Sequence, residues 1–456
     1  MSRRYKGGVI SATAPTTSTS SATGVWTLNQ QMVAIVGSGW PSQPVGWIAL
    51  LGGAGAQQGR SVTVDNSGNV YVGGWSNASG TEDFQIEKYN ISGSIQWQRT
   101  LGGVGAENAN GIAVDSSSNV FVCGYSNASG SNDLQIAKYD TSGAIQWQRR
   151  LGSANNDTGA SVAVDSSGNV YVCGRSDNSG TNDVQIAKYN TSGTIQWQRR
   201  LGGVAADFAF SVAVDSSSNV YVCGQTDPTG AQEVLIAKYD TSGTIQWQRK
   251  LGGASDASGS GIAVDSSGNV FVCGTSVASG DGRFQIAKYN TSGTIQWQRS
   301  LGGSGITTTG TSAAVDSSGN VYVFGYSPVG GISNFQLAKY DTSGVIQWQR
   351  RLGGASASLG FSVAVDGSGN VYVSGYSNAS GTNDILSAKL PSDGSATGTY
   401  TVGGYSFTYA ASTLTDAVTT LTDAAASLTS AASSLTDAAS TLTDAVSTLT
   451  SSVTSI

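Results

Sequence analysis

With 456 residues, of which 62 are glycine and only 11% are charged, the chain is long enough to bury a large core without metal ions or disulfide bonds. Its net charge of −6 and the lack of a clustered basic segment argue against a nucleic-acid-binding surface. The chain contains no histidine, which excludes catalysis by a Ser–His or Cys–His pair and metal binding through imidazole.

Residues 1–44 are rich in Ser and Thr, and we expect them to form an extended arm. The first residues are basic, but no apolar segment of the length found in secretory signals follows them. No apolar run of about 18 residues occurs anywhere in the sequence. We therefore expect neither signal-directed secretion nor insertion into a membrane.

Residues 45–397 contain a repeat of 50 residues. Its Leu-Gly step recurs at Leu51, Leu101, Leu151, Leu201, Leu251, Leu301 and Leu352. Each copy contains two short alternating apolar runs around an "SSGN" turn, as in "SVAVDSSGNVYVCG", and two more runs around a turn such as "NTSG". Four antiparallel strands per copy, repeated seven times, predict an all-β fold, a seven-bladed β-propeller with four-stranded blades.

The last copy is incomplete. After Asp366 it runs into "AKLPSDGSATGTY" without the tryptophan that marks the fourth strand of the other copies. The segment "PVGWIALLGG" around Trp47 has this ending but no preceding strands. We predict that residues 45–51 form the fourth strand of the seventh blade and thereby close the ring.

The repeat pattern, exemplified by "AVDSSGNVYVCG" followed by "IAKYDTSGTIQWQ", resembles the bacterial β-propeller repeats called SBBP repeats over residues 45–389. This resemblance implies the propeller fold. It implies little about activity, because one fold carries many functions.

One face of the predicted propeller differs from blade to blade. The turns within blades are nearly constant, whereas the second turn of each blade and the crossings to the next blade, such as "VAADFAF" and "ASDASGS", share little. We call the end that carries these segments the variable face. Aromatic and arginine side chains there are typical of recognition surfaces, although neutral drift is the better explanation for any single position. The predicted ligand-binding residues are Trp75, Tyr125, Arg175, Tyr326 and Tyr376 after the second strands, and Arg60, Phe210 and Phe361 near the central mouth.

Other polar positions have structural interpretations. Asp83 and its equivalents in other blades start strands, and we expect no metal or cofactor site from them. Cys123, Cys173, Cys223 and Cys273 occupy one position in successive blades, which predicts buried free thiols.

A short hairpin about Gly403–Gly404 is expected over residues 398–411, as a collar above the tail, and residues 412–456 repeat every seven residues. Leucine at one heptad position and Ala or Val four residues later predict a helical coiled coil and a homo-oligomer, with three parallel chains by analogy with fibres. The alternative is a disordered Ser/Thr-rich tail. The predicted oligomerisation residues are Leu414, Val418, Leu421, Leu428, Leu435, Leu442, Val446 and Leu449.

The segment "KGGVISATAPTTSTSSATGVWTLNQQ" is similar to the opening of virion structural proteins of tailed phages, especially those that infect cyanobacteria. The similarity implies a non-enzymatic virion protein, assembled in the host cytoplasm and exposed on the particle as a fibre, spike or capsid decoration. Its partners would be other virion proteins and a host-surface glycan or receptor. The alternatives are a purely architectural virion module without a ligand and a carbohydrate-active propeller enzyme, which would need converging carboxylates.

Overall fold

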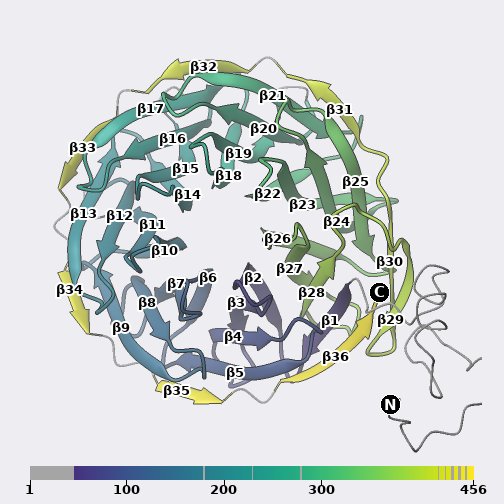
Figure 1. Cartoon of the computed structure of the whole chain (residues 1–456). Coiled ribbons are helices and arrows are strands. Elements are labelled where there is room, and N and C mark those ends of the chain that lie inside the picture. Colours follow the sequence, from purple (N-terminus) through teal and green to yellow (C-terminus); the bar gives the residue numbers. More distant parts are fainter. Residues whose placement is uncertain are drawn as a thin grey trace, which may run out of the picture.

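The computed structural model describes residues 46–177, 180–227, 230–277, 280–419, 421–426, 428–432, 436–439, 443–446 and 449–456. The predicted N-terminal arm, residues 1–44, lies outside this range. Seven antiparallel sheets surround a central axis in the described chain (Figure 1). The predicted seven-bladed β-propeller is therefore confirmed.

Six blades are built from four consecutive strands each, and the first strand lies nearest the axis (Figure 1). Blade one contains β2 (Gln57–Val64), β3 (Val70–Ser76), β4 (Asp83–Tyr89) and β5 (Ile95–Gly102), and blade two contains β6 (Glu107–Val114), β7 (Val120–Ser126), β8 (Asp133–Tyr139) and β9 (Ile145–Gly152). Blade three contains β10 (Asp157–Val164), β11 (Val170–Ser176), β12 (Asp183–Tyr189) and β13 (Ile195–Gly202), and blade four contains β14 (Asp207–Val214), β15 (Val220–Thr226), β16 (Glu233–Tyr239) and β17 (Ile245–Gly252). Blade five contains β18 (Ala257–Val264), β19 (Val270–Ser276), β20 (Arg283–Tyr289) and β21 (Ile295–Gly302), and blade six contains β22 (Thr309–Val315), β23 (Val321–Val329), β24 (Ile332–Tyr340) and β25 (Ile346–Gly353).

Blade seven combines the two ends of the repeat region. It contains β26 (Ser358–Val365), β27 (Val371–Ser377), β28 (Asp384–Leu390) and β1 (Trp47–Gly52). The ladder between β1 and β28 is antiparallel and pairs Trp47 with Lys389 and Leu51 with Ile385. The predicted ring closure is thus confirmed, and no blade keeps the unpaired edge that a missing fourth strand would leave.

Trp47 also makes the contact that the other tryptophans make with the following blade. Its indole N–H donates to the carbonyl of Ile91 at 3.3 Å, and its ring stacks on Tyr89 with centroids 5.5 Å apart. Trp97 makes the equivalent hydrogen bond to Thr141 at 3.2 Å and stacks on Tyr139. The closing contact between blades seven and one therefore repeats the contact found within the ring.

The hairpin about Gly403–Gly404 is present as β29 (Gly398–Val402) and β30 (Tyr405–Ala411). It forms no separate collar, because β30 pairs with β25 and extends blade six. The segment that follows continues in the same way. Its strands are β31 (Thr415–Val418), β32 (Thr422–Ala425), β33 (Thr429–Ala432), β34 (Thr436–Ala439), β35 (Thr443–Val446) and β36 (Thr450–Ser455).

We call β30–β36 the belt, because these strands run around the outside of the propeller (Figure 1). They pair in turn with the outer strands of blades six, five, four, three, two, one and seven, opposite to the chain order of the blades. The regular elements among the described residues of the tail are strands and none is a helix, so the predicted helical coiled coil is not found in them. Leu435 and Leu442 lie outside the described residues, and Val446 lies in β35.

The seven-residue period therefore corresponds to one blade rather than two helical turns. Thr and Ser are weak helix formers, whereas each outer strand offers an edge with free N–H and C=O groups. Leu421 is buried in a core cluster with Leu251 and Tyr289, and Leu449 is buried in one with Trp47. Each leucine of the seven-residue repeat that the structure describes thus contacts the propeller of its own chain instead of a second helix.

Side-chain hydrogen bonds also hold the belt to the blades. The amide of Gln298 donates to the carbonyl of Leu421 at 2.9 Å, and Gln349 donates to that of Leu414 at 2.7 Å. The hydroxyl of Tyr289 donates to Asp423 at 3.0 Å. Burial raises the pKa of the Asp423 carboxyl group above its usual value.

The belt can be distinguished from a coiled coil by two substitutions. Leu421 is 8% exposed, whereas Val418 is 69% exposed. We expect Leu421→Ala to lower the free energy of unfolding by about 2–4 kcal/mol because it leaves a cavity, and Val418→Ala to change it by less than about 0.5 kcal/mol. Denaturant titration of both variants measures this. Equal losses at the two positions, together with a helical circular-dichroism signal, would contradict the belt.

The contact between blades seven and one has an unusual pair of residues. Elsewhere, an aliphatic residue of one blade shares a core cluster with an alanine of the next, as Ile136 does with Ala187. The equivalent residues at the closing contact are Ser387 and Glu87, both buried. At this contact serine replaces the aliphatic residue and glutamate replaces the alanine, so the combined volume of the two side chains stays similar.

Burial gives Glu87 an unusual proton affinity. Its side chain is fully buried, and the Gln85 side chain is the one described neighbour that lowers its pKa through hydrogen bonding, an effect smaller than that of burial. Loss of hydration raises the pKa of this carboxyl group to about 8, so the folded protein binds a proton that the unfolded chain releases at lower pH.

This predicts that rising pH weakens the fold. From the ordinary glutamate pKa near 4.5 up to about 8, the unfolded chain is ionised at Glu87 and the folded chain is not, so stability falls by up to about 1.4 kcal/mol per pH unit. Glu87→Gln and Glu87→Ala should both remove this slope, and alanine is the residue of the other six blades. Denaturant titrations at several pH values test it. A pH dependence unchanged in both variants would show that Glu87 is ionised in the folded protein.

Candidate functional site

A β-bulge positions one side chain per blade at the central mouth. In blade one, Gly59 pairs with Gly74 and Ser61 with Gly73, so Arg60 is an extra residue without a partner in the ladder. The same shift occurs in every blade. We call these extra residues the bulge ring: Arg60, Asn110, Ala160, Phe210, Ser260, Thr311 and Phe361. A bulge turns its extra side chain away from the regular alternation of the strand.

Glycine permits the bulge. A Cβ atom at Gly74 would lie 1.8 Å from the carbonyl oxygen of Gln58, and one at Gly174 would lie 1.8 Å from that of Thr158. These distances are impossible for carbon and oxygen, so the second strand needs glycine where the first strand bends toward it. The repeated glycine therefore fixes the geometry of the mouth.

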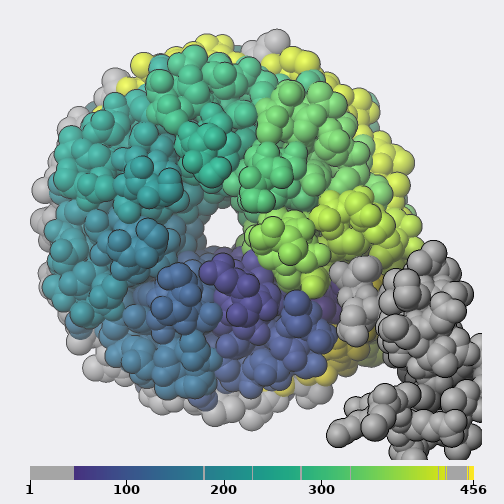
Figure 2. Space-filling model, viewed as in Figure 1, coloured from purple at the N-terminus to yellow at the C-terminus, as the bar shows by residue number. Residues whose placement is uncertain are grey.

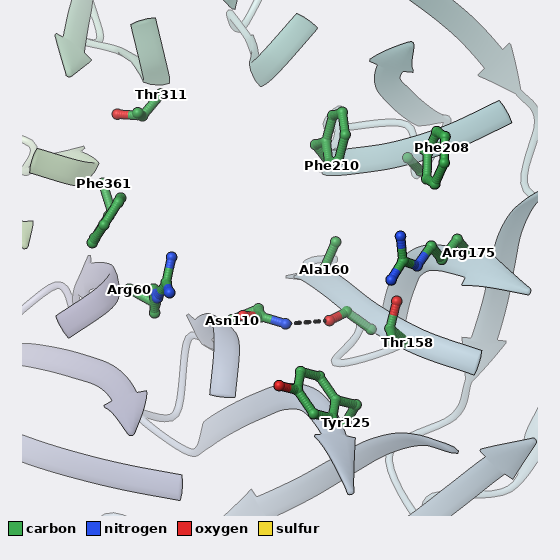
Figure 3. Close-up of a pocket in the computed structure, with 12 residues that line it drawn as sticks. Arg60, Asn110, Tyr125, Thr158, Ala160, Arg175, Phe208, Phe210, Thr311 and Phe361 are labelled. Carbon is green, nitrogen blue, oxygen red and sulfur yellow. Dashed lines mark hydrogen bonds between the residues drawn. The ribbon is translucent and has the colours of Figure 1, made fainter. Parts of the chain in front are cut away.

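The bulge ring borders a central opening, which Figure 2 shows in the space-filling view. A cavity of about 340 Å³ lies at this mouth. It is lined by Arg60, Asn110, Tyr125, Thr158, Gly159, Ala160, Arg175, Phe208, Ala209, Phe210, Thr311 and Phe361 (Figure 3). Six members of the bulge ring are among these residues, and no lining residue is acidic.

Two arginine–aromatic groups lie in the mouth. In the first, the Arg60 guanidinium lies 4.5 Å from the centre of the Phe361 ring, which lies 5.8 Å from the Tyr376 ring. In the second, the Arg175 guanidinium lies 5.4 Å from the centre of Phe208. The Phe208 ring is parallel to that of Phe210, with centroids 6.2 Å apart. Cation–π contact orients both guanidinium groups without consuming their N–H donors.

The Tyr125 hydroxyl is affected by the charges of both arginines. Burial, and after it the negative charge of Glu82, raise the pKa of this hydroxyl, whereas the positive charges of Arg60 and Arg175 lower it by less. Burial also lowers the pKa of Arg60 below its ordinary value. An arginine keeps its charge under these conditions, so the mouth is electropositive.

Asn110 and Thr311 have structural roles at the mouth. The amide of Asn110 donates to the carbonyl of Gly159 in the next blade at 2.8 Å (Figure 3). The hydroxyl of Thr311 lies 3.1 Å from the carbonyl oxygens of Phe324 and Gly360. These bonds connect adjacent blades at the height of the bulge ring.

The structure brings most of the sequence-predicted site residues together. Arg60, Tyr125, Arg175, Phe210 and Phe361 line one cavity. Tyr376 lies beside it through its contact with Phe361, and Tyr326 contributes to the electrostatic environment of Arg60. Trp75 is only 8% exposed and does not line the cavity.

Phe208 and Thr158 also line the cavity, although they were not among the site residues predicted from the sequence. Each stands two residues before a member of the bulge ring, and in a regular strand such residues share a face. That spacing was available in the sequence, but the bulge that accompanies it was not recognised.

The other predicted polar positions have structural partners. Asp133 and Asp183 form ion pairs with Arg150 and Arg200 at 3.4 and 3.0 Å. No group of three or more Cys, Asp or Glu side chains suited to a metal occurs among the described residues. Cys123, Cys173, Cys223 and Cys273 are buried free thiols, as predicted. No helix in the described part of the chain has the length and apolar character needed to cross a membrane.

Comparison with solved structures found distant matches. Sqt1 from Chaetomium thermophilum is 12% identical, with a TM-score of 0.40 and coverage of 74% of this chain and 95% of that one. The polysaccharide lyase Uly1 is 10% identical, with a TM-score of 0.48 and coverage of 75% and 91%. A gluconolactonase, XC5397 from Xanthomonas campestris, is 12% identical, with a TM-score of 0.38 and coverage of 65% and 90%. These likenesses carry no information on activity.

No curated protein matches the sequence. The family model of the SBBP beta-propeller repeat matches residues 46–80, 96–130, 146–180, 196–228, 246–279, 296–330 and 347–381, which together are more than half of the chain. The chain therefore belongs to the SBBP beta-propeller repeat family.

Proposed function

We propose that the protein is a non-enzymatic recognition protein of a virion, in which the variable face of the propeller binds a host-surface glycan or receptor. The observation that carries the recognition part is the mouth cavity, whose lining differs from blade to blade within an otherwise repetitive ring. Purely structural repeats need no such difference. Two arginines and several aromatic rings at one concave site are the residue types that recognition surfaces favour.

The non-enzymatic part of the proposal rests on the chemistry of the mouth. Glycoside hydrolysis usually requires two carboxyl groups about 5–10 Å apart. None of the residues that line the cavity is acidic, and none is histidine. Asn110 and Thr311, which carry polar groups, already bond to the neighbouring blade.

The virion part rests on a resemblance of residues 6–31 to the opening of tailed-phage structural proteins, which is an expectation from the sequence alone. The particle would be assembled in the host cytoplasm and would display the propeller on its surface. We leave the coiled-coil trimer out of the proposal, because Leu414, Leu421 and Leu449 are buried against the propeller of the same chain. An architectural module without a ligand is the second candidate, favoured by the belt, which holds all seven blades together.

Recognition is tested by substituting the two aromatic members of the bulge ring. We expect the labelled protein to bind cyanobacterial cells, and the double variant Phe210→Ala and Phe361→Ala to bind at least tenfold more weakly, because the aromatic surface is lost. Val345→Ala is the matched control, since Val345 is 51% exposed in an intrablade turn away from the variable face. Flow cytometry measures the binding.

Two outcomes would contradict the proposal. Equal binding by the double variant and the control would exclude the mouth as the recognition site. Absence of the protein from the surface of purified phage particles in immunogold electron microscopy would exclude the virion role, while leaving recognition by the mouth to the cell-binding experiment.

A further inference from the structure

We propose that the mouth cavity recognises an acidic saccharide, a sugar unit that carries an anionic group, through Arg60 and Arg175. This inference rests on the proposed recognition function and specifies its ligand. The two guanidinium groups supply anion-binding donors, and Phe208, Phe210 and Phe361 supply flat apolar surfaces at the same cavity (Figure 3).

The two guanidinium groups have unused hydrogen-bonding capacity. Neither Arg60 nor Arg175 forms a hydrogen bond or ion pair with another described residue, and the Nε atom of Arg60 is buried without a partner. By contrast, Arg149 and Arg249 on the outer strands β9 and β17 donate to glycine carbonyls at 2.6 and 2.7 Å. A buried, unpaired donor is costly, and an anionic ligand would satisfy it with a charge-assisted bond.

The acidic side chain that acts on Arg60, Glu82, does not line the mouth cavity. Glu82 raises the pKa of Arg60, so its negative charge reaches the guanidinium group. The Glu82 carboxylate already accepts a hydrogen bond of 2.7 Å from the amide of Asn108, and it does not line the cavity. The two positive charges are therefore available to a ligand.

The aromatic rings favour a sugar as the carrier of the anion. The parallel rings of Phe208 and Phe210 present flat apolar faces, on which the C–H faces of a sugar ring can pack. Phe210 is 37% exposed, so part of its ring is open to a ligand. The cavity volume of about 340 Å³ lies at the lower end of the range of small-ligand sites, about 300–1,000 Å³, and suits a short oligosaccharide segment.

The overall charge limits the length of ligand that is recognised. The chain carries a net charge of −6, so a long polyanion is repelled once it extends beyond the mouth. This favours one or a few acidic sugar units over a nucleic acid, although a nucleotide could also stack on the phenylalanines. A nucleotide is therefore included in the test.

The experiment is isothermal titration of the full chain with four probes: a glucuronic-acid-containing tetrasaccharide, a sulfated disaccharide, neutral cellotetraose and adenosine monophosphate. We expect at least tenfold tighter binding of the acidic tetrasaccharide than of cellotetraose. Arg60→Gln and Arg175→Gln should each weaken that binding about tenfold or more, because each removes one charge-assisted contact. Arg351→Gln, on the outer strand β25, is the control and should leave it unchanged.

The outcomes separate this inference from the proposed function. Equal binding of cellotetraose, unaffected by the arginine variants, would overturn the acidic class and leave glycan recognition standing. Binding of the sulfated disaccharide alone would support the anionic class and identify sulfate as its source. Tighter binding of adenosine monophosphate would overturn the saccharide. Failure of all probes would overturn the inference, and the cell-binding experiment would then decide the proposed function independently.

Discussion

The pairing of β1 with β28 is the interaction on which the structure depends. Without it, blade seven would have three strands and an open edge, and Tyr89 of blade one would lose its stacking partner Trp47. Because each blade packs only against its two neighbours, one missing contact would open the ring at a single place. The closure must form between residues more than 330 positions apart, so its loop entropy is large and is offset by a full strand ladder and a buried tryptophan.

The belt adds a second layer of closure over the first. It covers the outer edge of every blade and ends on β1, the strand that closes the ring. The outer strands would otherwise present seven unpaired edges to solvent, and such edges favour pairing between molecules. The tail therefore protects the propeller against association, whereas a coiled coil would have promoted it.

The blades were predictable because several independent signals agreed: alternating apolar residues, turn residues and a 50-residue period. The tail was not, because a period of seven is compatible with a helical seam and with one strand per blade. Leu421 alone does not distinguish a coiled coil from the belt, because it would be buried in both structures. The decisive information is that Arg249–Gly252 presents an open edge to Thr422–Ala425, and this emerges only from the folded ring. In the same way, the position of Arg60 at the mouth was predicted from the sequence. The β-bulge that turns its side chain toward the mouth and its cation–π contact with Phe361 were not predicted.

The antiparallel ladder between β1 and β36 brings the two ends of the described chain to the same end of one sheet. Trp47 pairs with Ser455, and the N–H of Ile456 donates to the carbonyl of Gly46. A mechanical load applied between these two ends would thus break the hydrogen bonds of the ladder one pair at a time, in the manner of a zipper, rather than all together in shear. Tension would release β36 first and then peel the tail away from blade one, blade two and the rest in sequence, so the molecule would yield gradually from its outside before the ring itself carried any force.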